Sequence, residues 1–177
     1  MERALVIVKP DGVERSLIGN VVSRFEAAGL KVVGAKMLLP DEEKTGRHYA
    51  EDEPWLLSVG KKSKQSYMEK GIETKESERE IGMKVRSLLI SEFMRGPVFA
   101  FILEGNAANE TARKLAGSTE PKKADPSTIR GSYSTDSYAL ADLEKRPVRN
   151  IIHVSDSPEG AEREIKIWFT AAEIFKR

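Results

Sequence analysis

The chain has 177 residues, with 29 Lys and Arg against 28 Asp and Glu, two histidines and no cysteine. This length fits one domain, since domains typically run to about 100–150 residues. A formal net charge of +1 excludes a globally basic nucleic-acid binder. The lack of cysteine excludes disulfides, thiolate zinc sites and cysteine nucleophiles, and two histidines make a multi-histidine metal site unexpected.

Apolar runs are short throughout the sequence. Val98–Leu103, one of the longest, falls far below the ~20 residues that a helix needs to cross a bilayer. Met1 is followed by Glu2 and a strand-like run, without the pattern of a signal peptide. We therefore expect a cytoplasmic protein with no membrane-spanning segment.

The first predicted elements form a strand–helix–strand unit. Residues 3–8 (RALVIV) are β-branched and apolar and end at the turn-rich tetrad 9–12 (KPDG). Apolar residues then recur at helical spacing over 17–28, and Gly29 stands where a C-terminal cap is expected. Residues 31–39 alternate apolar and polar side chains and predict a second strand.

Two charged or irregular stretches interrupt the predicted core. Residues 61–80 (KKSKQSYMEKGIETKESERE) are so rich in charge that we interpret them as a solvated excursion. Ser77 and Glu80 form a capping-box pattern, which predicts an amphipathic helix running to Phe93. A second interruption, residues 132–146, lies within a long late loop.

A second unit repeats the plan of the first. Its predicted elements are a strand over 98–103, a helix over 108–115 ended by Gly117, a strand over 149–154, a helix opened by Ser157-Pro158, and a short terminal helix capped by Thr170 and Glu173. Two such units predict a four-stranded sheet with helices on one face. A parallel, doubly wound sheet is the competing topology that these patterns leave open.

Polar side chains cluster at the ends of the predicted elements. They are Lys9, Arg113, Thr119, Arg130, Asn150 and His153. Three cations, hydroxyl and amide groups and one imidazole suit a polyanion held beside a nucleophile. His48, next to Tyr49, reads as a surface residue, and no G-x-x-x-x-G-K-[ST] phosphate loop is present.

Several motifs, taken together, resemble those of the nucleoside diphosphate kinase family. The matching segments, in family order, are VIVKPDGVERSLIG at 6–19, RFEAAGLKVVGAKML at 24–38, HYAED at 48–52, RGPVFAFILEGNAA at 95–108, RKLAGSTEP at 113–121, STIRGSYS at 127–134 and RNIIHVSDSPEGAEREIKIWF at 149–169. The NIIHxSDS pattern is specific, and KPDGV and TIRG support it upstream. The resemblance covers all but about 55–90 and 132–148.

The resemblance implies an α+β fold, the ferredoxin-like β-α-β-β-α-β sandwich with a four-stranded antiparallel sheet. It implies a single domain over 1–177, with inserted segments at about 55–90 and 132–148. Family members usually form hexamers built from dimers, so a homo-oligomer is expected.

The resemblance also implies the reaction. The family transfers the γ-phosphoryl group of a nucleoside triphosphate, usually ATP, to a nucleoside diphosphate through a phosphohistidine. His153 matches that nucleophile, and an imidazole with an ordinary pKa of ~6.5 is largely neutral near pH 7. The residues that match the family's contacts to phosphate and ribose are Lys9, Arg113 and Arg130 as cations, with Thr119 and Asn150 as hydroxyl and amide.

Other matched residues have supporting roles in the family. Glu164 matches the acid that orients the imidazole, with Ser155 in the same network, and Tyr49 matches the tyrosine beside the nucleophile. Trp55 resembles the aromatic residue that stacks on the base. Mg²⁺ is expected to arrive with the nucleotide phosphates, without a firm protein ligand, although Asp156 and Asp11 are close enough in the motifs to assist.

The sequence departs from the family at Val154, where glycine commonly follows the histidine. Two other functions fit the same resemblance. One is a regulatory or RNA-binding protein that has lost turnover, which the low aromatic content and neutral charge disfavour. The other is a histidine phosphocarrier that passes its phosphoryl group to protein partners. We expect neither a membrane nor a specific nucleic acid as partner.

Overall fold

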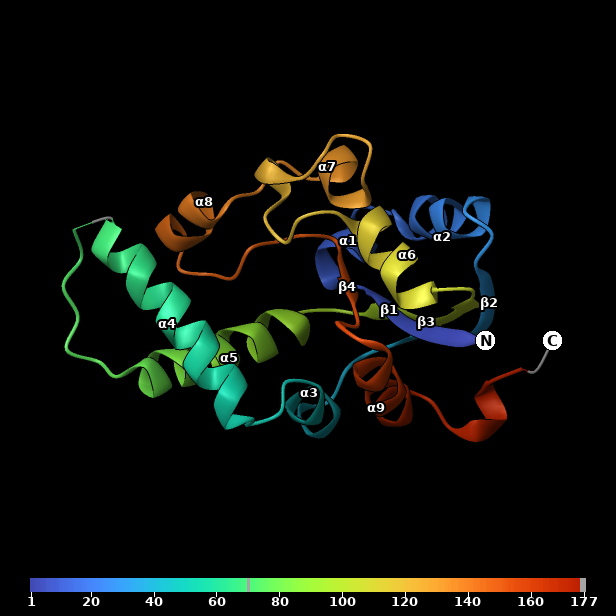
Figure 1. Ribbon diagram of the computed structural model, residues 1–177, viewed down its shortest axis with the longest axis horizontal. Coiled ribbons are helices and arrows are strands. Elements are labelled where there is room, and N and C mark those ends of the chain that lie inside the picture. The colour runs from blue at the N-terminus through green and yellow to red at the C-terminus, as the bar shows by residue number, and fades with distance from the viewer. Residues whose placement is uncertain (70, 176–177) are drawn as a thin grey trace.

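The computed structural model describes residues 1–69 and 71–175. Residue 70, within the predicted excursion 61–80, and residues 176–177 lie outside the described residues. Among the described residues, four strands form one sheet in the order β2-β3-β1-β4 (Figure 1). The strands are β1 (Glu2–Val8), β2 (Lys31–Leu38), β3 (Val98–Gly105) and β4 (Ile152–Val154). Every neighbouring pair is antiparallel, so the α+β, ferredoxin-like prediction is confirmed and the parallel rival is wrong.

Helices cover both faces of this sheet, and the prediction of helices on one face is therefore wrong. Helices α2 (Ile18–Ala27) and α6 (Ala108–Ala116) bury one set of β1 side chains, including Val6. Helix α9 (Pro158–Trp168) covers the other set, including Ile7, with Phe93 from α5 (Glu78–Phe93). The cause is visible in β1, whose residues 4–8 are all fully buried instead of alternating with solvent.

Several predicted element ends are confirmed. Ser157 accepts a hydrogen bond from the Gly160 backbone and starts α9, with proline at its first turn. Thr170 and Glu173 form a capping box around a short 3₁₀ helix, Ala171–Glu173. The tetrad 9–12, predicted as a turn, instead opens helix α1 (Pro10–Glu14), because proline is well suited to a first helical turn.

The predicted excursion 61–80 is solvated as expected, since none of its described residues is buried, but its first half is helical. Helix α4 (Glu53–Glu69) packs against α5 (Glu78–Phe93), and this hairpin extends away from the sheet (Figure 1). The two backbones meet at glycines: a Cβ at Gly60 would overlap the Glu78 carbonyl, and one at Gly82 would overlap the Leu56 carbonyl. The capping box of Ser77 with Glu80 is present as predicted. Over residues 1–69 and 71–175, no helix is long and apolar enough to cross a membrane.

The segment between α6 and β4 wraps over the end of the sheet near β4 (Figure 1). It contains a 3₁₀ turn (Pro121–Lys123) and two short helices, α7 (Ile129–Tyr133) and α8 (Tyr138–Leu143). Asp136 anchors it, because its carboxylate accepts hydrogen bonds from the Arg146 guanidinium and from the Arg149 backbone. The predicted strand 149–154 is shorter than expected, since Ile151 has φ +70° and leaves extended geometry.

Candidate active site

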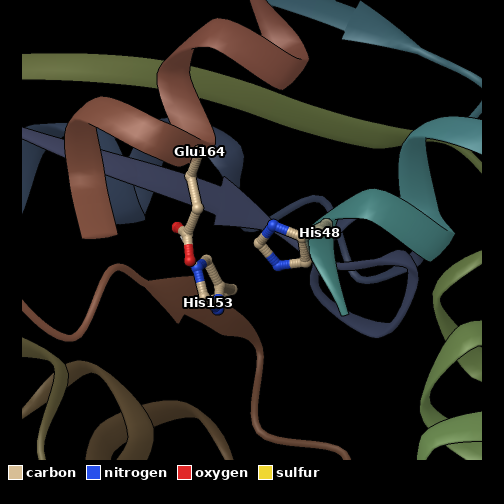
Figure 2. A group of neighbouring side chains, drawn as sticks. All are labelled: His48, His153 and Glu164. Atoms are coloured by element: carbon tan, nitrogen blue, oxygen red, sulfur yellow. Dashed lines mark hydrogen bonds and ion pairs between the residues drawn. The ribbon is translucent and has the colours of Figure 1, made fainter. Parts of the chain in front are cut away.

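His153 lies in β4, directly opposite Ile7 of β1, and faces helix α9. Its Nε2 is 2.8 Å from Oε2 of Glu164, which α9 presents to it (Figure 2). Glu164 is buried, with an exposed fraction of 4%, and also accepts a bond from Arg163. Because an ionised carboxylate only accepts hydrogen bonds, the proton of the neutral imidazole is placed on Nε2.

This tautomer leaves the Nδ1 lone pair of His153 free. The side chain retains 21% of its exposure, so a substrate can reach it. Val154, the departure from the family pattern, does not crowd it: its side chain is buried in the opposite core, beneath α2 and α6. The geometry therefore presents one accessible, oriented imidazole nitrogen, as a nucleophile requires.

The second histidine is also here, and its interpretation as a surface residue is wrong. His48, the last residue of α3 (Glu42–His48), is 5% exposed and its ring centroid lies 4.4 Å from that of His153. Trp168 donates its indole N–H to Nδ1 of His48 at 3.2 Å. Burial, followed by the nearby His153 and Arg163, lowers the pKa of His48 well below its ordinary value.

His48, His153 and Glu164 each offer a polar atom, and these atoms lie within 4.8 Å of one another (Figure 2). Such a set resembles a metal centre in composition. However, the indole N–H can only donate, so Nδ1 of His48 must be its acceptor and Nε2 carries the proton. Neither nitrogen then has a free lone pair for a cation, and the set does not fit a metal ion.

The backbone that leads into His153 is fixed by buried polar contacts. Asp11 accepts the Ile151 N–H at 2.9 Å, and the Lys9 N–H donates to the Ile151 carbonyl at 2.8 Å. These bonds hold a β-branched residue at positive φ, a conformation that costs free energy and persists only when its surroundings enforce it. Oδ2 of Asp11 is therefore already used as the acceptor for the Ile151 backbone N–H.

Lys9 follows β1 and lies diagonally from His153, since Ile7 is its neighbour on the same sheet face. It lines a small recess with Tyr49, Glu92, Phe93 and Pro147. Burial lowers the pKa of Lys9 to about 8, although Asp11 opposes the shift. A desolvated ammonium at this position would attract an anion strongly.

The two predicted arginines differ in how they are held. Arg130 donates to three backbone carbonyls, those of Gly117 at 2.8 Å, Ile152 at 2.9 Å and Asn150 at 3.3 Å. Arg113, on α6, is exposed, and its guanidinium has no hydrogen bond or ion pair with any residue in the described ranges. Burial and the Arg113 charge lower the pKa of Arg130 to about 10. Because these two positive charges repel each other, a phosphate bound between them would be stabilised by both.

Thr119 and Asn150 lie next to this pair. The Asn150 side-chain amide donates to the Thr119 carbonyl at 2.8 Å, which ties the loop after α6 to the start of β4. Thr119 is exposed, and its hydroxyl has no partner among the residues that the structure describes. Asn150 is buried, so its contribution to the site is in part to hold the loop.

Tyr49 follows helix α3, and Trp55 lies six residues later in the first turn of α4. The Tyr49 ring contacts the rings of His48 and Phe93, and burial together with Glu164 raises the pKa of its phenol. Trp55, in the first turn of α4, is half-buried, and its side chain makes no ring contact or hydrogen bond within residues 1–69 and 71–175. The structure therefore brings Tyr49, but not Trp55, into contact with the histidine cluster.

Ser155 does not join the Glu164 network, contrary to the prediction. Its Oγ accepts hydrogen bonds from the Leu5 N–H and the Asn109 side-chain amide, both at 3.1 Å. The reason is that Ser155 continues the pairing of β4 with β1, so its side chain is used within the sheet edge. Asp156, one residue later, is exposed and carries no hydrogen bond in the described part of the chain.

A recess of about 450 Å³ opens on the far side of Asp11, between the segment 131–136 and Arg149. His153 is not among its lining residues. Its three arginines are already engaged: Arg146 with Asp136, Arg149 with Glu92, and Arg15 with the Tyr133 carbonyl. We therefore place the reacting centre at His153 and not in this larger hollow.

Sequence reasoning missed three residues of this site. Asn109 holds the start of α9 through bonds to the Ser155 and Ser157 carbonyls. Trp168 belongs to no polar motif in the sequence, although a buried indole N–H usually needs an acceptor. His48 lies three residues after Thr45, which is also buried, and this helical spacing was the available signal for a buried face.

Comparison with known proteins agrees with this geometry. The model of the family "Nucleoside diphosphate kinase" matches residues 2–55 and 75–174. The unmatched internal stretch, 56–74, is narrower than the predicted insertion at about 55–90. A nucleoside diphosphate kinase of Pyrobaculum aerophilum is 44% identical over 181 residues, which cover 99% of both chains.

Solved structures agree as well. The crystal structure of an NDP kinase from Pyrobaculum aerophilum has a TM-score of 0.96 at 43% identity and covers 99% of each chain. A Borrelia burgdorferi nucleoside-diphosphate kinase with bound vanadate and ADP, described as a transition-state mimic, has a TM-score of 0.79 at 39% identity, over 99% of this chain and 91% of that one. The chain belongs to the nucleoside diphosphate kinase family.

Proposed function

We propose that this chain transfers the γ-phosphoryl group of a nucleoside triphosphate, usually ATP, to a nucleoside diphosphate through a phosphohistidine on His153. The observation that carries the proposal is the 2.8 Å bond from Nε2 of His153 to the buried Glu164, which leaves Nδ1 free and accessible. Family membership supplies the reaction class.

In the first half-reaction, the Nδ1 lone pair of His153 forms a bond to the γ-phosphorus as the bond from phosphorus to the β-phosphate oxygen breaks. The nucleoside diphosphate leaves with that electron pair. The imidazole gains positive charge, which Glu164 stabilises without taking the Nε2 proton. In the second half-reaction, a terminal oxygen of another diphosphate attacks the same phosphorus and restores the neutral ring.

The cations act by position and charge, which dominate phosphoryl transfer. The side-chain donors of Arg113 and Lys9 have no partner among the described residues, and burial desolvates the Lys9 ammonium. Arg130 is assigned both to phosphate and to the backbone that carries β4. Thr119 and Asn150 are proposed as phosphate and ribose contacts, and Tyr49 as a neighbour of the nucleophile.

Mg²⁺ is proposed to enter with the nucleotide, and the carboxylates of Asp11 and Asp156 are the protein groups that could assist it. Asp11 is committed to the Ile151 N–H through one oxygen, whereas Asp156 is an exposed carboxylate at the end of β4. Asp156 would therefore be the better candidate to assist, because its carboxylate has no partner among the described residues, and Mg²⁺ when bound would neutralise charge on the phosphate oxygens. Trp55 is proposed, from its sequence position, to stack on the base.

The test is kinetic. The protein is incubated with ATP and GDP at varied concentrations, and GTP formation is measured. Parallel double-reciprocal lines are expected for a ping-pong reaction. Absence of GTP would contradict the proposal. A homo-oligomer, which rests on the family resemblance, also belongs to the proposal, as does a cytoplasmic location.

A further inference from the structure

The bond between Trp168 and His48 fixes the state of a second imidazole beside the nucleophile. Both residues are buried, with exposed fractions of 1% and 5%. The indole N–H of Trp168 lies 3.2 Å from Nδ1 of His48. Since that N–H can only donate, Nδ1 must keep its lone pair, and His48 carries its single proton on Nε2.

A protonated His48 would conflict with these surroundings. Its second N–H would face the Trp168 N–H, so two donors would oppose each other in a buried space. Desolvation adds to this effect and favours the neutral ring. The charged and titratable groups that face His48 are Tyr49, which follows α3, Arg163 and Glu164 on α9, and His153 on β4, while α5 contributes the Phe93 ring.

The protonation state of His48 matters because His48 and the nucleophile His153 both lie next to the Glu164 carboxylate. Polar atoms of His48, His153 and Glu164 lie within 4.8 Å of one another (Figure 2). A cationic His48 would therefore compete with His153 for the Glu164 carboxylate. A neutral His48 leaves that carboxylate to His153 and packs against its ring, with the planes at 78°.

We propose that His48 is a positioning residue for phosphoryl transfer: a neutral imidazole, held by the Trp168 N–H, that fixes the ring of His153 and leaves Glu164 bonded to the nucleophile alone. This role rests on the proposed function. In this role Trp168 acts as a hydrogen-bond donor to His48 in addition to packing in the core.

The test compares three variants with wild type between pH 6 and pH 8. Trp168→Phe keeps an aromatic ring and removes the donor. Its kcat is expected within about twofold of wild type at pH 8 and about fivefold to tenfold below it at pH 6, with KM unchanged. Adding His48→Asn to Trp168→Phe removes the titrating ring, so the ratio to wild type should become independent of pH.

His48→Asn alone is the matched variant, because an amide oxygen can accept the Trp168 N–H at every pH. Its kcat is expected several-fold below wild type, with the same pH dependence as wild type. Thermal unfolding of each variant separates loss of fold from loss of rate. Imidazole ¹⁵N chemical shifts give a readout without turnover: His48 should be Nε2-protonated and non-titrating in wild type, and should titrate in Trp168→Phe.

Two results would overturn the role. One is a Trp168→Phe profile parallel to wild type at all pH values, and the other is a wild-type His48 that titrates near pH 6.5. Failure of the proposed function is distinct from both, since a wild type that takes no phosphoryl group from ATP overturns the function itself and the role with it.

Discussion

The site at β4 and the α4–α5 hairpin are held in different ways. At the site, buried polar groups specify the geometry: Asp11 holds Ile151, and Arg130 holds three carbonyls. The hairpin relies on the close approach of two backbones at Gly60 and Gly82. Its ion pairs, such as Arg79 with Glu53, are exposed and contribute little.

This difference teaches where sequence can vary. A buried polar network tolerates few substitutions, because each lost partner leaves a desolvated group behind. A helix pair fixed by shape needs only small residues at the contact. The family model accordingly matches both sides of the site but leaves 56–74 unmatched.

The largest effect should follow from breaking the network at Arg130. Arg130→Met leaves three carbonyl oxygens without their charged donor, which should lower the free energy of unfolding by about 2–4 kcal/mol. Activity should fall by at least about 100-fold, because β4 is no longer held and a phosphate cation is lost. Urea denaturation and GTP formation measure the two effects. A variant with wild-type stability would contradict the backbone role.

Arg113→Ala should separate activity from stability. Its guanidinium has no partner among the described residues, so we expect unchanged unfolding but a loss of about 1.5–3 kcal/mol in transition-state binding, roughly 10–100-fold in kcat/KM. Lys114→Ala is the control, an exposed neighbouring cation that pairs with Glu110. Equal effects of the two substitutions would show that Arg113 acts only through general charge.

The pH dependence of Lys9 should give an alkaline limb. Its pKa is lowered to about 8, so the ammonium is charged below that pH and neutral above it. We expect kcat/KM to fall roughly tenfold between pH 7 and pH 9, as the charged fraction does. Lys9→Arg should remove this limb whatever its absolute rate, because guanidinium stays charged. Retention of the limb in that variant would assign it to another group.

The smallest effect on activity is expected in the hairpin. Gly82→Ala forces α4 and α5 apart and should cost about 1–3 kcal/mol of stability, with kcat within about twofold of wild type. Gly19→Ala, in α2 with open space around it, is the control and should stabilise by about 0.5–1 kcal/mol. A large loss of kcat in Gly82→Ala would mean that the hairpin shapes the site.

Much of the fold could be predicted because local signals agreed with it. Strand β1 is continuous and apolar, and the caps at Ser77 and Ser157 are present where the sequence indicated them. That helices cover both faces of the sheet could not be predicted. A strand buried on both faces lacks the alternation of polar and apolar residues that distinguishes a solvent-facing side from a core-facing side. Helix α4 was not predicted, because the sequence of its second half is mostly charged and polar. Its contact with α5 depends on Gly60, and a single glycine gives no helical signal.

The site was predictable as far as its motif extended. Placing His153 beside Glu164 needs both β4 and α9, and the resemblance supplied that pairing. The hydrogen-bond partner of His48 could not be predicted locally, because Trp168 lies 120 residues away in sequence. Ser155 was misassigned for a related reason, since its partner Leu5 is on a strand 150 residues distant.

The central claim is that His153 carries the phosphoryl group, and labelling tests it most directly. Wild-type protein and His153→Asn are incubated with γ-labelled ATP, and GDP is then added. We expect wild type to take an acid-labile, alkali-stable label and to release it to GDP as GTP, while His153→Asn takes none. An unlabelled wild type, or a variant that labels equally well, would contradict the account.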